Sequence, residues 1–144
     1  ELSFGFAQVS VPSYRVRNVD VEWALEATGL GGEGERYPTE LGHGQRRLAG
    51  LARVLASRPR LVLLDEPAAG LDSAESVALA SRLRSLPDLG IGVLLVDHDM
   101  GLVLDVCEQI HVLDLGRVIA SGSPREVRTN PAVIEAYLGS EADG

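Results

Sequence analysis

The sequence is poor in cysteine and contains no long apolar run. Cys107 is the only cysteine among 144 residues, so the chain cannot form an internal disulfide bond or a cysteine-based zinc site. A single cysteine fits a reducing compartment. The longest apolar runs, Leu61–Leu64 and Ile91–Val96, are far shorter than the roughly 18 residues needed to span a bilayer. Nothing in the sequence resembles a signal peptide.

Positive charge and aromatic residues are also scarce. The chain has 13 Lys and Arg against 21 Asp and Glu, a net charge of −8, and a pI of about 4.8. This balance disfavours non-specific binding to nucleic acid. Trp23, the only tryptophan, is expected in a core or an interface. With 45% hydrophobic residues, the chain can bury a sizeable core as one domain.

The apolar periodicity predicts an α/β fold with a mainly parallel sheet flanked by helices and a terminal β-hairpin. The expected elements are helix 21–27, helix 45–57, strand 61–64, helix 73–86, strand 91–97, helix 101–107, strands 109–113 and 117–121, and helices that begin at 124 and 131. The order strand, helix, strand over 61–97 indicates a right-handed parallel crossover, and 109–121 indicates a hairpin. Alternation of Leu2, Phe4 and Phe6 suggests another short strand.

Individual residues predict boundaries and faces within these elements. Asn18 or Asp20 is expected to cap the first helix, and Asp72 with Glu75 to form a capping box for helix 73–86. The apolar face of that helix should contain Val77, Ala80, Leu83 and Leu86. Helix 45–57 should turn its basic residues away from its apolar stripe, namely Arg46, Arg47 and Arg53.

Two adjacent carboxylates follow the short apolar run Leu61–Leu64. A run this short, set between Pro59 and Pro67, is typical of a strand buried on both faces. Parallel sheets bind ligands at the carboxyl ends of their strands, where Asp65 and Glu66 lie. Asp65 can supply the hard oxygen that Mg²⁺ prefers, and Glu66 can polarise a water molecule. The alternative is that both acids cap the following turn.

His98 follows the next predicted strand and should lie at the same sheet edge. There its ring could contact a terminal phosphate or hold a water molecule. A lone surface histidine is more often a local hydrogen-bonding group, and only its pairing with the two acids favours a functional role.

The pentapeptide Leu41-Gly42-His43-Gly44-Gln45 precedes or begins a helix. Glycines there expose backbone N–H groups, and the helix dipole favours an anion, so the segment suits a phosphate. Alone, the pentapeptide would be interpreted as a flexible loop.

These three motifs, in this order and at this spacing, resemble the carboxyl-terminal half of an ABC-type ATP-binding cassette. The resemblance covers about Val21 to Ser140. Leu41–Gln45 resembles the signature loop, Leu61–Glu66 the Walker B strand with its catalytic glutamate, Ala69–Asp72 the D-loop, and His98 the switch histidine. The whole chain is then expected to be one partial nucleotide-binding domain: 1–18 poorly defined, 19–44 helical with the signature region, and 45–144 the core with its carboxyl-terminal hairpin and helices.

Five shorter segments of the sequence resemble the ATP-binding subunits of branched-chain amino-acid importers. The segments that carry this likeness are 66–71, 97–100, 116–120, 130–131 and 136–139. The resemblance implies ATP and Mg²⁺ as cofactors, a second nucleotide-binding domain and transmembrane permease subunits as partners, and a cytoplasmic position on the inner face of the membrane. It implies that Asp65 holds Mg²⁺, Glu66 and His98 act in catalysis, Leu41–Gln45 serve the partner's nucleotide, and Asp72 links the two sites.

The sequence departs from the family pattern in two places. Gly42 stands where the signature loop normally has serine, so one hydroxyl donor is missing, and His43 replaces a glycine. No Gly-x-x-x-x-Gly-Lys-Ser/Thr motif occurs, so the phosphate-binding loop is not in these 144 residues. Gln8 lies closer to Gly44 than the Mg²⁺-contacting glutamine of the family would.

Because of the missing loop, and because the sequence begins at Glu1, the chain is expected to be a fragment that is inactive alone. Two alternatives remain open. One is a non-enzymatic, degenerate cassette with a structural or regulatory role. The other is an ABC-like ATPase of DNA repair or chromosome organisation, against which the acidic charge argues; for the importer reading no nucleic-acid partner is expected.

Overall fold

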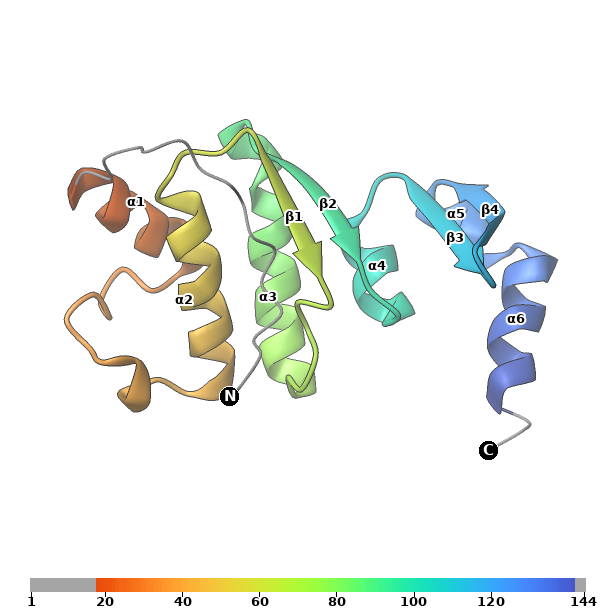
Figure 1. Cartoon of the computed structure of the whole chain (residues 1–144), viewed down its shortest axis with the longest axis horizontal. Helices are drawn as coiled ribbons and strands as arrows, with labels where there is room; N and C mark the ends of the chain where they lie inside the picture. Colours follow the sequence, from red (N-terminus) through yellow and green to blue (C-terminus); the bar gives the residue numbers. More distant parts are fainter. Residues whose placement is uncertain (1–17, 142–144) are drawn as a thin grey trace. The chain divides into compact units, whose positions relative to one another are not determined.

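The computed structural model describes residues 18–141, in which helices alternate with short strands (Figure 1). The elements are α1 (Asn18–Thr28), η1 (Pro38–Glu40), α2 (His43–Leu55), β1 (Leu61–Asp65), α3 (Ser73–Ser85), η2 (Pro87–Leu89), β2 (Gly92–Val96), α4 (Met100–Val106), β3 (Ile110–Asp114), β4 (Arg117–Gly122), α5 (Pro124–Arg128) and α6 (Pro131–Glu141). No helix within these residues is long and apolar enough to cross a membrane. The predicted strand at 2–6 and Gln8 lie outside the described residues.

The chain divides into two compact units, Glu1–His98 and Asp99–Gly144. In the first unit, β1 and β2 form a two-stranded parallel sheet whose register runs from Leu61 opposite Gly92 to Asp65 opposite Val96. The parallel strand–helix–strand arrangement predicted for 61–97 is therefore confirmed. The short helix η2 and Gly90 return the chain from α3 to β2.

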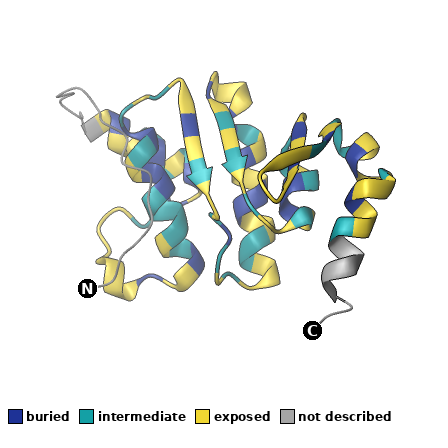
Figure 2. Cartoon of the chain, turned by 45° about the vertical axis from the view of Figure 1, so that its right-hand side comes forward, coloured by how far each residue is buried: buried dark blue, intermediate teal, exposed yellow. Residues whose placement is uncertain are grey.

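One face of this sheet is open, which contradicts the prediction of a strand buried on both faces. Val62 is buried, whereas Leu61 and Leu63 are 56% and 46% exposed. In β2, Leu94 and Val96 are 57% and 59% exposed (Figure 2). Alternate residues of a strand point to opposite faces, so these four side chains share one apolar surface. The sequence predicted a sheet with helices packed on both faces, and the described residues pack against one face only.

Apolar residues of α2 and α3 contribute to the core of the first unit. The stripe on α2 buries Leu51, Ala52 and Leu55, as its 3.6-residue period predicts. On α3 the buried residues are Leu79, Ala80 and Leu83, followed by Leu86. The assignment of Val77 to this face is wrong, because its side chain is 67% exposed. The face is rotated so that Leu79 takes the inner position.

Asp20 joins α1 to the segment that follows α2. It lies in the first turn of α1, its side chain is fully buried, and its Oδ1 accepts a hydrogen bond from Arg58 Nε at 3.1 Å. The Arg58 guanidinium also lies 3.6 Å from the ring centroid of Trp23. A cation over an indole face is attracted by the ring quadrupole. Trp23 is thus half-buried in the contact between α1 and the segment that follows α2.

The second unit is built on an antiparallel hairpin of β3 and β4, as predicted. The register pairs Ile110 with Gly122 and Asp114 with Arg117, with a bulge next to Val112. Leu115 and Gly116 form the two-residue turn with φ of +46° and +76°. Positive φ at both central positions is the pattern of the tight turn that fits the twist of a hairpin. Leu115 is 96% exposed.

Capping residues begin α5 and α6 where the sequence indicated them. Ser123 caps α5, and Glu126 Oε2 accepts from both the N–H and the hydroxyl of Ser123, at 2.8 and 2.7 Å. These hydrogen bonds lower the pKa of Glu126. Asn130 Oδ1 accepts from the Ala132 N–H at 2.9 Å. Burial raises the pKa of the half-buried Cys107 thiol.

Replacing Arg58 by alanine should lower the free energy of unfolding of the first unit by about 2 kcal/mol, because the buried Asp20 carboxylate loses a charged hydrogen-bond partner. The backbone at residue 58 has φ of +52°, and alanine there is strained as arginine is, so the comparison isolates the side chain. Urea unfolding followed by Trp23 fluorescence measures the change. Arg60→Ala, an exposed arginine two residues away, is the control, and an equal loss in both variants would contradict the role of Asp20.

Candidate functional site

The carboxyl ends of β1 and β2 bring three predicted site residues to one edge. Asp65 is the last residue of β1, and Glu66 continues the pairing, since its N–H donates to the Val96 carbonyl at 2.8 Å. His98 follows β2, and its Nδ1 lies 3.3 Å from Glu66 Oε1 and 3.7 Å from Asp97 Oδ1. The His98 and Glu66 side chains are 78% and 55% exposed, whereas that of Asp97 is 2% exposed. The histidine is thus held between one open and one buried carboxylate.

Glu66 has an unusual backbone conformation. Its φ is +44°, in the left-handed region that a residue with a side chain adopts at a cost of roughly 1–2 kcal/mol. Residue 66 begins the turn that follows β1, and its N–H remains hydrogen-bonded to the Val96 carbonyl. Strain of this kind often accompanies function, because a relaxed alternative would aim the side chain elsewhere.

The donor set at this edge fits a hard divalent cation. Mg²⁺ binds one or two carboxylates and keeps several waters, so the exposed carboxylate of Asp65 is sufficient to hold it. Within residues 18–141 there is no group of three or more His, Cys, Asp or Glu side chains that could enclose a metal ion. The edge therefore resembles an open cation site more than a closed structural one.

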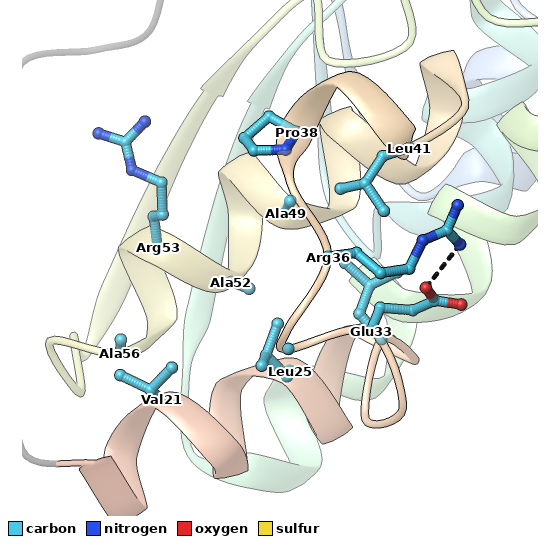
Figure 3. A pocket seen from close by; sticks show the side chains of 12 residues that line it. Val21, Leu25, Glu33, Arg36, Pro38, Leu41, Ala49, Ala52, Arg53 and Ala56 are labelled. Atoms are coloured by element: carbon cyan, nitrogen blue, oxygen red, sulfur yellow. Dashed lines mark hydrogen bonds and ion pairs between the residues drawn. The ribbon is translucent and has the colours of Figure 1, made fainter.

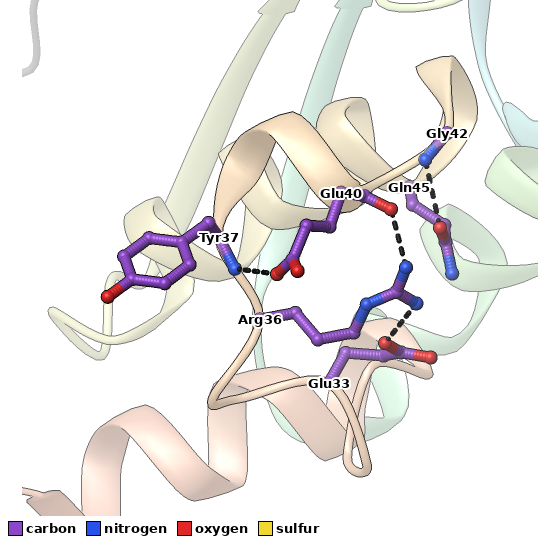
Figure 4. A network of polar contacts seen from close by, with 6 residues as sticks. All are labelled: Glu33, Arg36, Tyr37, Glu40, Gly42 and Gln45. Carbon is purple, nitrogen blue, oxygen red and sulfur yellow. Dashed lines mark hydrogen bonds and ion pairs between the residues drawn. The ribbon is translucent and has the colours of Figure 1, made fainter.

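The pentapeptide Leu41–Gln45 forms the start of α2. Leu41 is buried, and Gly42 is the residue before the first turn. The Gly42 N–H donates to Gln45 Oε1 at 3.0 Å (Figure 4). Gln45 thus caps its own helix. His43 is exposed, and Gly44 is buried. The helix begins two residues before the predicted Gln45.

Polar contacts order the loop that leads into this pentapeptide. Arg36 Nη1 contacts Glu33 Oε2 at 2.7 Å, and its Nη2 donates to the Glu40 carbonyl. The Tyr37 N–H donates to Glu40 Oε2 at 2.7 Å (Figure 4). The glycine-rich segment 31–44 thus contains the short helix η1 and a set of local hydrogen bonds.

A cavity of about 410 Å³ lies between α1, α2 and the connecting loop (Figure 3). Its walls are mostly apolar, with Leu25 and Ala52 on facing helices and the Glu33–Arg36 pair at the loop side. Leu41 is the only predicted site residue that lines it. The cavity is therefore distinct from the carboxylate and histidine edge.

Glu75 and Arg47 are two further residues of this region whose tertiary contacts sequence reasoning missed. Glu75 Oε1 accepts from the Gly44 N–H at 2.7 Å, and Glu75 Oε2 accepts from the Asp72 N–H at 3.2 Å. Arg47 Nη2 donates to the Ala69 carbonyl at 2.9 Å. Arg47, predicted to face away from the apolar stripe of its helix, thus makes a tertiary contact that the sequence did not indicate. The capping-box pattern revealed the local role of Glu75, and no sequence signal indicated its contact with Gly44.

Two family comparisons agree with this geometry. Residues 5–69 match the ABC transporter family, and residues 117–143 match the family described as branched-chain amino acid ATP-binding cassette transporter. The first match contains the pentapeptide and the two carboxylates. The second contains β4, α5 and α6.

Curated relatives match a larger part of the chain. The high-affinity branched-chain amino acid transport ATP-binding protein BraF of Pseudomonas aeruginosa is 42% identical over 118 residues, which are 80% of this chain and 46% of BraF. The lipopolysaccharide export system ATP-binding protein LptB of Acidithiobacillus ferridurans is 42% identical over 101 residues, 70% of this chain and 42% of LptB. The chain thus spans less than half the length of these relatives.

Solved structures show the same fold. The ADP conformation of MJ1267, an ATP-binding cassette of an ABC transporter, superposes with a TM-score of 0.78 and 27% identity, over 90% of this chain and 52% of that one. The architecture and the strand-end carboxylates thus define an ATP-binding cassette. With both family matches and these relatives, the chain belongs to the ABC transporter ATP-binding family.

The substitution Glu66→Gly should raise the free energy of unfolding of the first unit by about 1 kcal/mol. Glycine adopts a positive φ without strain, and the side chain that is removed is exposed. Glu66→Ala is the matched control, since it removes the same carboxylate and retains the strain. Urea unfolding of both variants measures the difference. Equal stability of the glycine and alanine variants would show that the backbone is not strained at this position.

Proposed function

We propose that this chain is the carboxyl-terminal part of the ATP-binding subunit of an ABC importer for branched-chain amino acids. The observation that carries the proposal is the convergence of Asp65, Glu66 and His98 at the ends of two paired parallel strands, with Glu66 Oε1 3.3 Å from His98 Nδ1. Such an edge can bind a cation, orient a water molecule and contact a phosphate oxygen at the same time.

Each side chain has a distinct role in this proposal. Asp65 holds Mg²⁺, which when bound neutralises charge on the phosphate oxygens of ATP. Glu66 accepts a hydrogen bond from the attacking water and orients it. His98, whose Nδ1 contacts Glu66 and Asp97, contacts the terminal phosphate. The positive φ of Glu66 keeps its carboxylate beside the histidine and away from the turn.

The pentapeptide acts towards a second cassette. The helix dipole at the start of α2 favours the phosphate of a nucleotide held by the partner domain. Gly42 offers no hydroxyl, and the N–H groups of Gly42 and Gly44 donate within the chain to Gln45 and Glu75, while His43 is exposed beside them. Asp72, at the end of the turn 69–72, links the two ATP sites across the pair of cassettes. Transmembrane permease subunits complete the importer, and the cassette lies on the cytoplasmic face of the membrane.

Branched-chain amino acids are the proposed cargo because residues 117–143 match the branched-chain cassette family. The match to LptB limits this argument, since LptB belongs to an export system for lipopolysaccharide. The cargo assignment therefore depends on the second unit, and the ATP-site assignment depends on the first.

The 144-residue chain alone should show no Mg²⁺-dependent ATP turnover above that of its Glu66→Gln variant, because it has no phosphate-binding loop motif. Joining the chain to the part of BraF that the match does not cover should give an active chimera. In the chimera, Glu66→Gln should reduce turnover at least 100-fold and His98→Ala at least tenfold. A phosphate-release assay measures these rates.

Asp88→Asn is the matched control, because Asp88 is an exposed carboxylate in η2, just before β2 and away from the carboxyl ends of the strands. It should leave turnover unchanged. An active chimera whose rate does not respond to Glu66→Gln would contradict the proposed ATP site. Turnover by the chain alone that Glu66→Gln abolishes would contradict its inactivity. Failure of the chimera to restore leucine uptake in Pseudomonas aeruginosa lacking BraF would contradict the cargo alone.

The open face of the sheet supports a second candidate function, a non-enzymatic cassette that self-associates. Leu61, Leu63, Leu94 and Val96 form an exposed apolar surface, and within residues 18–141 each strand pairs only with the other. Unpaired strand edges and apolar faces favour association between chains.

Light scattering over a range of concentrations should then show oligomers of the 144-residue chain. Leu94→Glu should shift them towards monomer, because it places a charge in the middle of the apolar face. Val77→Glu, a change of the same kind at an exposed position of α3, should not. A chain that is monomeric at all concentrations would exclude this second function.

A further inference from the structure

Glu75 contacts two segments that are far apart in the sequence. Its Oε1 accepts from the N–H of Gly44 in α2 at 2.7 Å, and its Oε2 accepts from the N–H of Asp72 at 3.2 Å. Asp72 in return accepts from the Glu75 N–H at 2.8 Å. A single half-buried carboxylate therefore bridges the pentapeptide 41–45 and the turn 69–72.

Helix capping alone does not explain this arrangement. Glu126 occupies the equivalent position in α5, and there Oε2 accepts both hydrogen bonds from its own cap residue, Ser123. Glu75 uses one oxygen for its own cap and directs the other to a residue 31 positions earlier in the chain. The contact with Gly44 is thus additional to what the helix needs.

The residue at position 44 is adapted to this contact. A Cβ atom at Gly44 would lie 2.8–2.9 Å from Cγ, Cδ and Oε1 of Glu75, closer than real Cβ atoms approach. Any side chain at position 44 would therefore displace the carboxylate. A second hydrogen bond, from Arg47 Nη2 to the Ala69 carbonyl at 2.9 Å, joins the same two segments.

We infer that Glu75 is a positioning residue that holds the signature loop and the D-loop together as one body. The bond to Gly44 fixes the start of α2, and the bond to Asp72 fixes the end of the turn, so movement of either segment is transmitted to the other. The functional meaning rests on the proposed function, in which both segments face a second cassette. Glu75 itself contacts no nucleotide and acts by setting the separation of the two loops.

Amide hydrogen exchange followed by NMR on the 144-residue chain tests this inference. In Glu75→Ala, exchange at Gly44 and at Asp72 should both accelerate, on the order of tenfold, because each N–H loses its acceptor. Glu75→Gln has a single acceptor oxygen and should protect only one of the two amides. Glu126→Ala is the matched control and should change only the cap of α5 at Ser123.

A double-mutant cycle separates coupling from local capping. Gly44→Ala should accelerate exchange at Asp72, because the new methyl group displaces Glu75. Added to Glu75→Ala, the same substitution should change Asp72 exchange no further, so the two effects should not add. The amides of β1 and β2 serve as internal references for an intact fold. If exchange at these amides also accelerates in Glu75→Ala, the inference is judged on Glu75→Gln, which should protect only one of the Gly44 and Asp72 amides.

The inference is overturned if Glu75→Ala accelerates exchange at Asp72 alone, or if the effects of Gly44→Ala and Glu75→Ala at Asp72 add. Because exchange is measured without nucleotide, this outcome is independent of ATP turnover. A failed proposed function would leave the coupling intact, and a failed coupling would leave the roles of Glu66 and His98 intact.

Discussion

The parallel pairing of β1 with β2 is the constraint on which the candidate site depends. Its register places Asp65 opposite Val96, and one further hydrogen bond, from Glu66 to Val96, carries the pairing into the following residue. A shift of one residue would turn Asp65 to the opposite face and separate Glu66 from His98, because strand side chains alternate. The buried side chain of Val62 specifies the register, since a shift would expose it and bury a neighbour instead.

Much of this site could be predicted because its signals are local. A short apolar run followed by two acids, a second run followed by histidine, and an intervening helix fix which residues meet at one edge. The caps at Asp72 and Ser123 are equally local, since the capping box needs only residues three apart. These elements agree with the structure because the backbone has few alternatives at each position.

The errors arose where tertiary contacts decide. Asp20 has the chemistry of a cap, but burial against Arg58 gives it another role that no short pattern reveals. Arg47 would be solvent-exposed on an isolated helix, whereas here its guanidinium donates a hydrogen bond to the Ala69 carbonyl. The apolar run 61–64 indicates a strand covered on both faces, whereas Leu61 and Leu63 are exposed on one face. The sequence thus indicated the chemistry of each segment more reliably than it indicated which other segments each one contacts.

The turn of the β3–β4 hairpin has a different consequence. Leu115 is almost wholly exposed and has φ of +46°, so it contributes neither to a core nor to a relaxed backbone. Gly116 next to it has the conformation that glycine adopts without strain. The chain could therefore be opened between residues 115 and 116 to make a circular permutant, or extended there by an inserted domain, without disturbing either unit.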